Sequence, residues 1–141
     1  MELEKLSQTS SEIGSYLFPV GGTYNYRVIG GTRRLSAHAF GIAIDLAPDR
    51  RDYWRWASRQ QGEERLKAYP PQIVEAFEKN NFIWGGKWGH FDIMHYEYRP
   101  EIILKARYFQ NSTRLWGKWY YGFPYQDEDV KKYINIIEKS L

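Results

Sequence analysis

The sequence predicts a small α+β protein, and three observations lead to this fold class. Strand patterns and helix patterns do not alternate regularly along the chain, which disfavours a doubly wound sheet. Hydrophobic residues make up 43% of the chain and charged residues 26%, a composition typical of a globular domain. The length of 141 residues suits one compact domain, so we expect residues 1–141 to share one core.

The first elements have weak patterns. Residues 1–15 are polar and suit a short helix or an arm. Residues 19–34 hold two Gly-Gly pairs around an apolar, aromatic run, which predicts a strand between turns. In residues 41–49, aliphatic side chains alternate with Ala43 and Asp45, which predicts a strand with Asp45 on the face opposite the aliphatic one.

The later elements follow from clearer signals. The charged, aromatic residues 48–61 favour a helical insertion. Residues 69–82 form the clearest helix, with a proline in the first turn and an apolar stripe. The glycine-rich loop 83–89 leads into a strand at 90–98. Residues 126–141 read as an amphipathic helix with acids in its first turn.

Composition limits the possible partners and cofactors. The net charge is +3 and no dense Lys/Arg stripe is present, so nucleic acid is not expected as a partner. Cysteine is absent, so a transition metal would have to be held by histidine and carboxylate. No apolar run of about 18 residues predicts a membrane span, and the N-terminus lacks the pattern of a signal peptide. We also expect a monomer.

Two of the three histidines, together with one aspartate, suggest a metal site. A catalytic zinc ion takes three protein ligands and keeps a fourth position open for water. His38, Asp45 and His95 supply such a set, and Gly41 allows a turn between His38 and the strand. His90 is expected to line the cleft or face solvent.

Two carboxylates near His95 are candidates for the general base. Asp92 lies three residues before His95 and can reach a metal-activated water without being a ligand. Strict alternation would place Asp92 and His95 on opposite faces, so Asp92 must lie in a bend or bulge. Glu97 shares the face of His95 and is either a rival base or a partner for a ligand's second ring nitrogen.

Two motifs resemble one known family. The stretch SAHAFGIAID matches the pattern S-x-H-x-x-G-x-A-x-D of the zinc D-alanyl-D-alanine carboxypeptidases (VanY type), and DIMH matches that family's [D/E]-x-x-H. The similarity runs from about residue 25 to residue 100. Residues 1–141 would then be one zinc peptidase domain, with a C-terminal aromatic segment and helix at 101–141.

The resemblance implies a site and a fold. One Zn²⁺ per chain would be bound by His38, Asp45 and His95, with Asp92 as the general base. The fold would be a small antiparallel sheet flanked by helices, with the zinc site in a cleft on the sheet. The family serine near the substrate's carboxylate corresponds to Ser36, whose alternative role is to cap the turn.

The family's upstream arginine has three candidates here. Arg27, Arg33 and Arg34 compete, and we favour Arg27 as the group that steadies the developing oxyanion. A solvated loop arginine is the alternative for each of them.

Four tryptophans lie in glycine-rich or aromatic context and suit core packing: Trp84, Trp88, Trp116 and Trp119. Trp84 and Trp88 precede the second motif, so the alternative is that they line the substrate groove. We assign Trp88 to substrate binding.

The resemblance implies a zinc metallopeptidase that hydrolyses peptidoglycan stem peptides in the cell wall, with D-Ala-D-Ala carboxypeptidase activity favoured. Three alternatives are an L-Ala-D-Glu endopeptidase, a non-catalytic zinc domain and a metal-free wall-binding module. Because this substrate lies outside the cytoplasm, the resemblance also implies export to the periplasm or cell wall.

Overall fold

The computed structural model describes residues 2–108, 120 and 123–139, in two compact units, Met1–Tyr98 and Arg99–Leu141. The elements of the first unit are α1 (Glu2–Thr9), α2 (Ser11–Leu17), η1 (Ala37–Phe40), β1 (Ala43–Asp45), α3 (Arg59–Ala68), α4 (Pro71–Lys79), β2 (Phe82–Trp84), η2 (Gly85–Lys87) and β3 (His95–Tyr98). Those of the second are α5 (Pro100–Tyr108) and α6 (Glu128–Glu138). The expectation of a single domain stays a prediction.

The sheet has three antiparallel strands in the order β1-β3-β2, which confirms the α+β class. Asp45 pairs with His95, and Ile44 pairs with Tyr96. Side chains of directly paired residues share a face. One face of the sheet therefore carries Asp45 and His95, and the other carries Ile44 and Tyr96.

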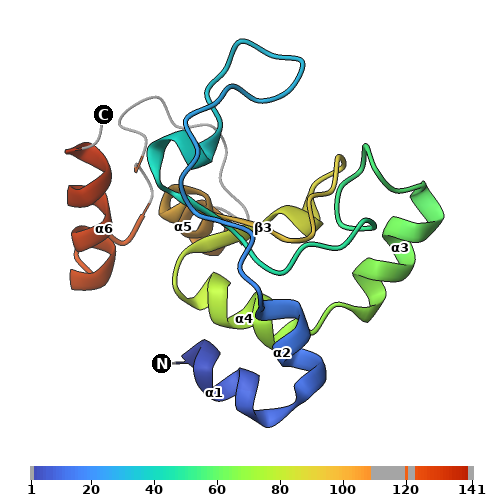
Figure 1. Cartoon of the computed structure of the whole chain (residues 1–141). Coiled ribbons are helices and arrows are strands. Elements are labelled where there is room, and N and C mark those ends of the chain that lie inside the picture. The colour runs from blue at the N-terminus through green and yellow to red at the C-terminus, as the bar shows by residue number, and fades with distance from the viewer. Residues whose placement is uncertain (1, 109–119, 121–122, 140–141) are drawn as a thin grey trace. The chain divides into compact units, whose positions relative to one another are not determined.

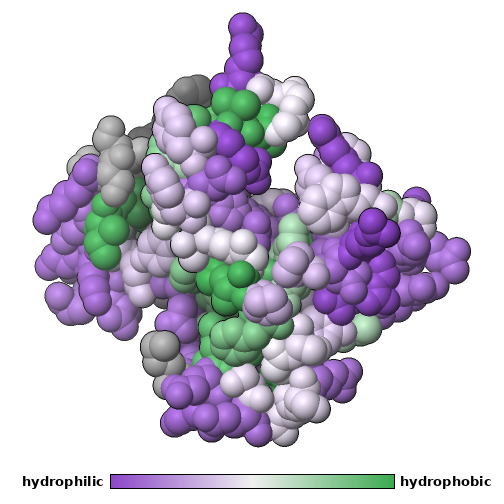
Figure 2. All heavy atoms as spheres, viewed as in Figure 1, coloured by the Kyte–Doolittle hydropathy of each residue, from purple (hydrophilic) through white to green (hydrophobic). Residues whose placement is uncertain are grey.

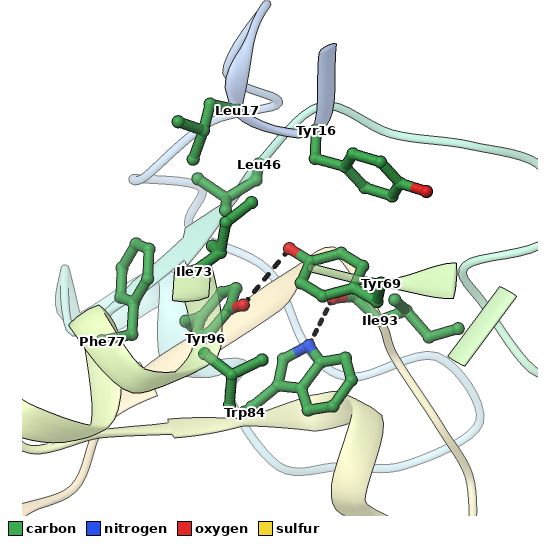
Figure 3. Packing of buried hydrophobic residues seen from close by; sticks show 10 residues of the cluster. Tyr16, Leu17, Leu46, Tyr69, Ile73, Phe77, Trp84, Ile93 and Tyr96 are labelled. Atoms are coloured by element: carbon green, nitrogen blue, oxygen red, sulfur yellow. Dashed lines mark hydrogen bonds between the residues drawn. The ribbon is translucent and has the colours of Figure 1, made fainter. Parts of the chain in front are cut away.

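The second of these faces belongs to the main core. Tyr96 is fully buried, and its ring stacks on Phe77 of α4 with centroids 4.0 Å apart. Figure 3 shows Tyr96 among side chains of α4 and β2, with its hydroxyl hydrogen-bonded to that of Tyr69. In Figure 1, α1, α2 and α4 lie together beside the sheet. Apolar side chains gather over α2 and α4, whereas hydrophilic ones cover α3 (Figure 2).

The ends of the helices follow local sequence signals. Pro71 opens α4 as predicted, and Asn80 caps its C-terminus. Before α3, Ser58 and Gln61 form a capping box, in which each side chain accepts a hydrogen bond from the other residue's backbone N–H. The helical insertion expected at 48–61 was placed too early, because this cap starts the helix only at Arg59.

The expected strands are shorter than predicted or absent, and of residues 41–49 only Ala43–Asp45 form a strand. Residues 19–34 form only isolated bridges, Gly22 with Asp45 and Val28 with Leu35, and project as the long loop of Figure 1. Tyr24 and Tyr26 are 69% and 71% exposed there, so this segment buries no face that would hold it in the sheet. The strand expected at 90–98 begins only at His95, after a turn.

The second unit has a small core of its own, formed by Leu104, Phe123, Val130 and Ile134. The side chain of Asp127 accepts hydrogen bonds from two backbone N–H groups and so caps α6, where a helix was predicted. Most of the expected aromatic segment, including Trp116 and Trp119, lies outside the described residues. Over the described ranges, no helix has both the length and the hydropathy of a membrane span.

Candidate metal centre

The structure brings together the three side chains that were predicted from the sequence as metal ligands. His38, Asp45 and His95 each offer one ligand atom, and these atoms all lie within 4.8 Å of one another. Asp45 Oδ1 is 2.8 Å from His95 Nδ1 and 3.2 Å from His38 Nε2. Two imidazole nitrogens and one carboxylate oxygen form a donor set of the kind that catalytic zinc uses, so the residues fit this metal.

Each ligand is positioned by its own segment. The 3₁₀-helix η1 carries His38, and its N-cap is Ser36, whose Oγ accepts a hydrogen bond from His38 N at 3.4 Å. Its C-cap is Gly41, whose φ of +67° few other residues adopt readily, as the predicted turn requires. The pairing of β1 with β3 then places Asp45 beside His95.

The second nitrogen of each ring also has a partner, and these partners select the nitrogen that faces the ligand group. His38 Nδ1 lies 2.9 Å from the carbonyl oxygen of Thr23, which leaves Nε2 directed at Asp45. His95 Nε2 lies 3.2 Å from Glu97 Oε1, which leaves Nδ1 directed at Asp45. Such partners fix ring orientation and tautomer in metal sites. Glu97 therefore has the geometry of the ring-nitrogen partner, one of its two predicted roles.

Asp45 and His95 each stabilise the charged form of the other. Burial opposes the charged form of Asp45, but the hydrogen bond and positive charge of His95 outweigh it and hold the pKa of this carboxyl below its usual value. Burial likewise opposes the charged form of His95, but the hydrogen bonds to Asp45 and Glu97 raise the pKa of His95 to about 9. The pocket therefore favours positive charge, which also suits a bound cation.

Asp92 lies next to this group in the bend that the sequence required. It forms an isolated bridge with Tyr53, and its carbonyl accepts the backbone N–H of His95 across a turn. Its Oδ1 is buried and has no hydrogen-bond partner within the described chain. Burial raises the pKa of Asp92 to about 6, a value suited to a group that takes up and releases protons near neutral pH.

A cavity lined in part by aromatic side chains lies beside Trp88, whose ring contacts His95 of the group. The rings of Trp88 and His95 are 5.6 Å apart, and Trp88 is only partly buried. It lines a cavity of about 430 Å³ together with Trp54 and His90, whose rings stack 4.2 Å apart. His90 is exposed and outside the ligand group, as predicted. Trp84 instead lies buried in the core.

The remaining predicted residues are less closely tied to the group. Arg27 is exposed, and its Nη1 lies 3.5 Å from the carbonyl oxygen of its neighbour Val28. Arg33 and Arg34 are also exposed. Ser36 is buried and has the capping role that was its alternative. A substrate role for Arg27 or Ser36 stays a prediction.

Several supporting residues were not foreseen. Thr23 acts through its backbone carbonyl, which no side-chain pattern reveals. Asp52 is fully buried and bound to Arg65 Nε at 2.8 Å, and its carbonyl oxygen accepts the backbone N–H of Ile93, the residue after Asp92. A buried aspartate within a charged, loop-like stretch gives no sequence signal.

Comparison with known proteins agrees with the motifs. A family model described as D-alanyl-D-alanine carboxypeptidase matches residues 30–98, which span all three ligand candidates and Asp92. No curated protein and no solved structure gives a match.

Proposed function

We propose that this protein is a zinc-dependent peptidase of peptidoglycan stem peptides, because residues 30–98 match the family model described as D-alanyl-D-alanine carboxypeptidase. We further propose that it removes the terminal D-Ala from D-Ala-D-Ala. The observation that carries the proposal is the convergence of His38, Asp45 and His95 beside a buried carboxyl oxygen of Asp92 that has no partner within the described chain. This combination provides a metal site and a separate group for proton transfer.

The side chains have distinct tasks in this proposal. A zinc ion held by His38, Asp45 and His95 would supply Lewis acidity at the scissile carbonyl and lower the pKa of water. Asp92 would accept a proton from the attacking water and pass it to the leaving amine. Asp92 is suited to both steps because its raised pKa, about 6, lets it exchange a proton near neutral pH.

The cavity beside Trp88 is proposed to hold part of the stem peptide. Its aromatic lining and volume of about 430 Å³ are typical of sites that bind small organic groups. Arg27, on the exposed loop, is proposed to steady the oxyanion or to bind substrate carboxylate. Export to the periplasm or cell wall, and action as a monomer, belong to the same proposal.

An L-Ala-D-Glu endopeptidase is the second candidate, because the same ligand motifs serve both reactions. A carboxypeptidase needs a closed pocket with a cation for the terminal carboxylate, whereas an endopeptidase needs a groove open at both ends. A non-catalytic zinc domain would need no proton-transfer group, and Asp92 argues against it. A metal-free wall-binding module would not need the converging ligand atoms.

The test is mass spectrometry of defined muropeptides after incubation with the full chain. Loss of one terminal alanine is expected, and it should stop with a chelator and return on addition of zinc. Release of an inner fragment would identify the endopeptidase instead. Unchanged muropeptides with the zinc-loaded chain would overturn the proposal of a peptidase.

A further inference from the structure

Two glycines lie directly against the backbone and Cβ of the two aspartates of the site. A methyl group on Gly21 would lie 3.1 Å from Asp45 Cβ and 3.0 Å from the carbonyl oxygen of Leu46. A methyl group on Gly85 would collide with the carbonyl oxygen of Asp92 and lie 3.2 Å from both Asp92 Cβ and the carbonyl oxygen of His95. Neither glycine has a positive φ, so close approach accounts for the small residue at both positions.

Backbone hydrogen bonds tie each glycine to the segment it touches. Gly21 N donates to the carbonyl oxygen of Asp45 at 2.8 Å, and Asp45 N donates to that of Gly22 at 2.8 Å. Asp92 N donates to the carbonyl oxygen of Gly85 at 3.0 Å. An added methyl group at Gly85 therefore requires the backbone to shift, whereas at Gly21 the backbone of Asp45 or Leu46 must move by a few tenths of an ångström.

The segment that bears Asp92 is also fixed from its other side. Ile93 N donates to the carbonyl oxygen of Asp52 at 2.7 Å. The indole of Trp84 donates to the carbonyl oxygen of Ile93 at 2.6 Å, one of the dashed bonds in Figure 3. Because both of these bonds resist movement and the contact with Asp92 is the tightest, a residue larger than Gly85 would displace Asp92 first and His95 less.

We infer that Gly21 and Gly85 are positioning residues with separate tasks. Gly21 lets Asp45 approach the two histidines and so sets metal affinity. Gly85 seats Asp92 and so sets the rate of proton transfer. The inference rests on the proposed function for the role of Asp92, whereas the task of Gly21 concerns metal binding alone.

The test compares two matched variants, Gly21→Ala and Gly85→Ala, in the full chain. Zinc affinity is measured by competition with a chromophoric chelator, and kcat and KM are measured with a muropeptide. Gly21→Ala should weaken zinc binding by about 10-fold to 100-fold, the usual effect of changing a group that supports a ligand. Gly85→Ala should keep zinc affinity within about threefold and lower kcat by about 100-fold, as misplacement of a reacting group by about 1 Å does.

A double-mutant cycle tests whether Gly85 acts through Asp92. In an Asp92→Asn background, Gly85→Ala should cause little further loss of kcat, because the group it positions is already disabled. Gly14→Ala is the control, since a methyl group there would meet only Ser7 O at 3.5 Å. Circular dichroism checks folding. If Gly85→Ala does not fold, Trp84→Phe replaces it, because it removes the bond to Ile93 and should likewise lower kcat with zinc retained.

Each part of the inference can fail separately. Unchanged zinc affinity in Gly21→Ala overturns the task of Gly21. Loss of zinc in Gly85→Ala, or fully additive losses in the cycle, overturns that of Gly85. Normal turnover in Asp92→Asn would instead show that the proposed function assigns the wrong base.

Discussion

Asp45 and His95 face each other directly across β1 and β3, with Asp45 Oδ1 2.8 Å from His95 Nδ1. The pairing places both side chains on the face of the sheet that is opposite the buried Tyr96. A slip of one residue in β1 would turn Asp45 into the core, so the packing of the core also specifies the candidate metal site.

The ligand assignment is tested by replacing each proposed ligand with alanine. His38→Ala, Asp45→Ala and His95→Ala should each lower zinc content, measured by elemental analysis. Each should also remove the thermal stabilisation that zinc gives, because metal binding to the folded state adds to its stability. His90→Ala is the matched histidine control and should keep full zinc. Full zinc occupancy in His95→Ala would disprove the ligand set.

The general-base assignment separates an enzyme from a zinc-bearing module. Asp92→Asn keeps the size of the side chain but cannot accept the proton, so turnover should fall by a factor on the order of 10²–10⁴ while zinc stays bound. Glu97→Gln retains a group that can hydrogen-bond to His95 Nε2, so it should lower turnover less than Asp92→Asn does. An inactive Glu97→Gln protein beside an active Asp92→Asn protein would reverse the two roles.

Trp88 and Trp84 should respond differently to truncation. Trp88 is partly exposed beside the cavity, so Trp88→Ala should raise KM and leave the thermal transition nearly unchanged. Trp84 is buried and bonded to Ile93, so Trp84→Ala should destabilise the fold by about 3–5 kcal/mol. Similar thermal losses in both variants would place Trp88 in the core.

The buried pair of Asp52 and Arg65 is expected to contribute to stability. Asp52→Asn would leave the Arg65 guanidinium buried without its counter-charge. The free energy of unfolding, measured by urea denaturation, should therefore fall by about 3–5 kcal/mol. Glu63→Gln, in the exposed pair with Arg59, should change stability by less than about 1 kcal/mol. Equal effects of the two changes would argue against a special role for the buried pair.

Much of the fold and of the candidate site was predictable where local chemistry decides the structure. The apolar stripe and proline placed α4, and the acidic first turn placed α6. The ligand candidates His38, Asp45 and His95 could be named because the chain has only three histidines and because two short motifs resemble those of a zinc peptidase family. Alternation also showed that Asp92 needed a bend before His95.

The sequence by itself determined which residue types are available to hold a metal and which segments can be helix or strand, because these depend on side-chain chemistry and short-range periodicity. Only the tertiary structure decided that the backbone carbonyl of Thr23 directs the ring of His38, and that Gly21 and Gly85 lie against the backbone and Cβ of Asp45 and Asp92. It also showed that residues 19–34, predicted as a strand, form only isolated bridges. These outcomes depend on contacts between segments distant in sequence, and on backbone atoms that every residue carries alike, so no local pattern encodes them.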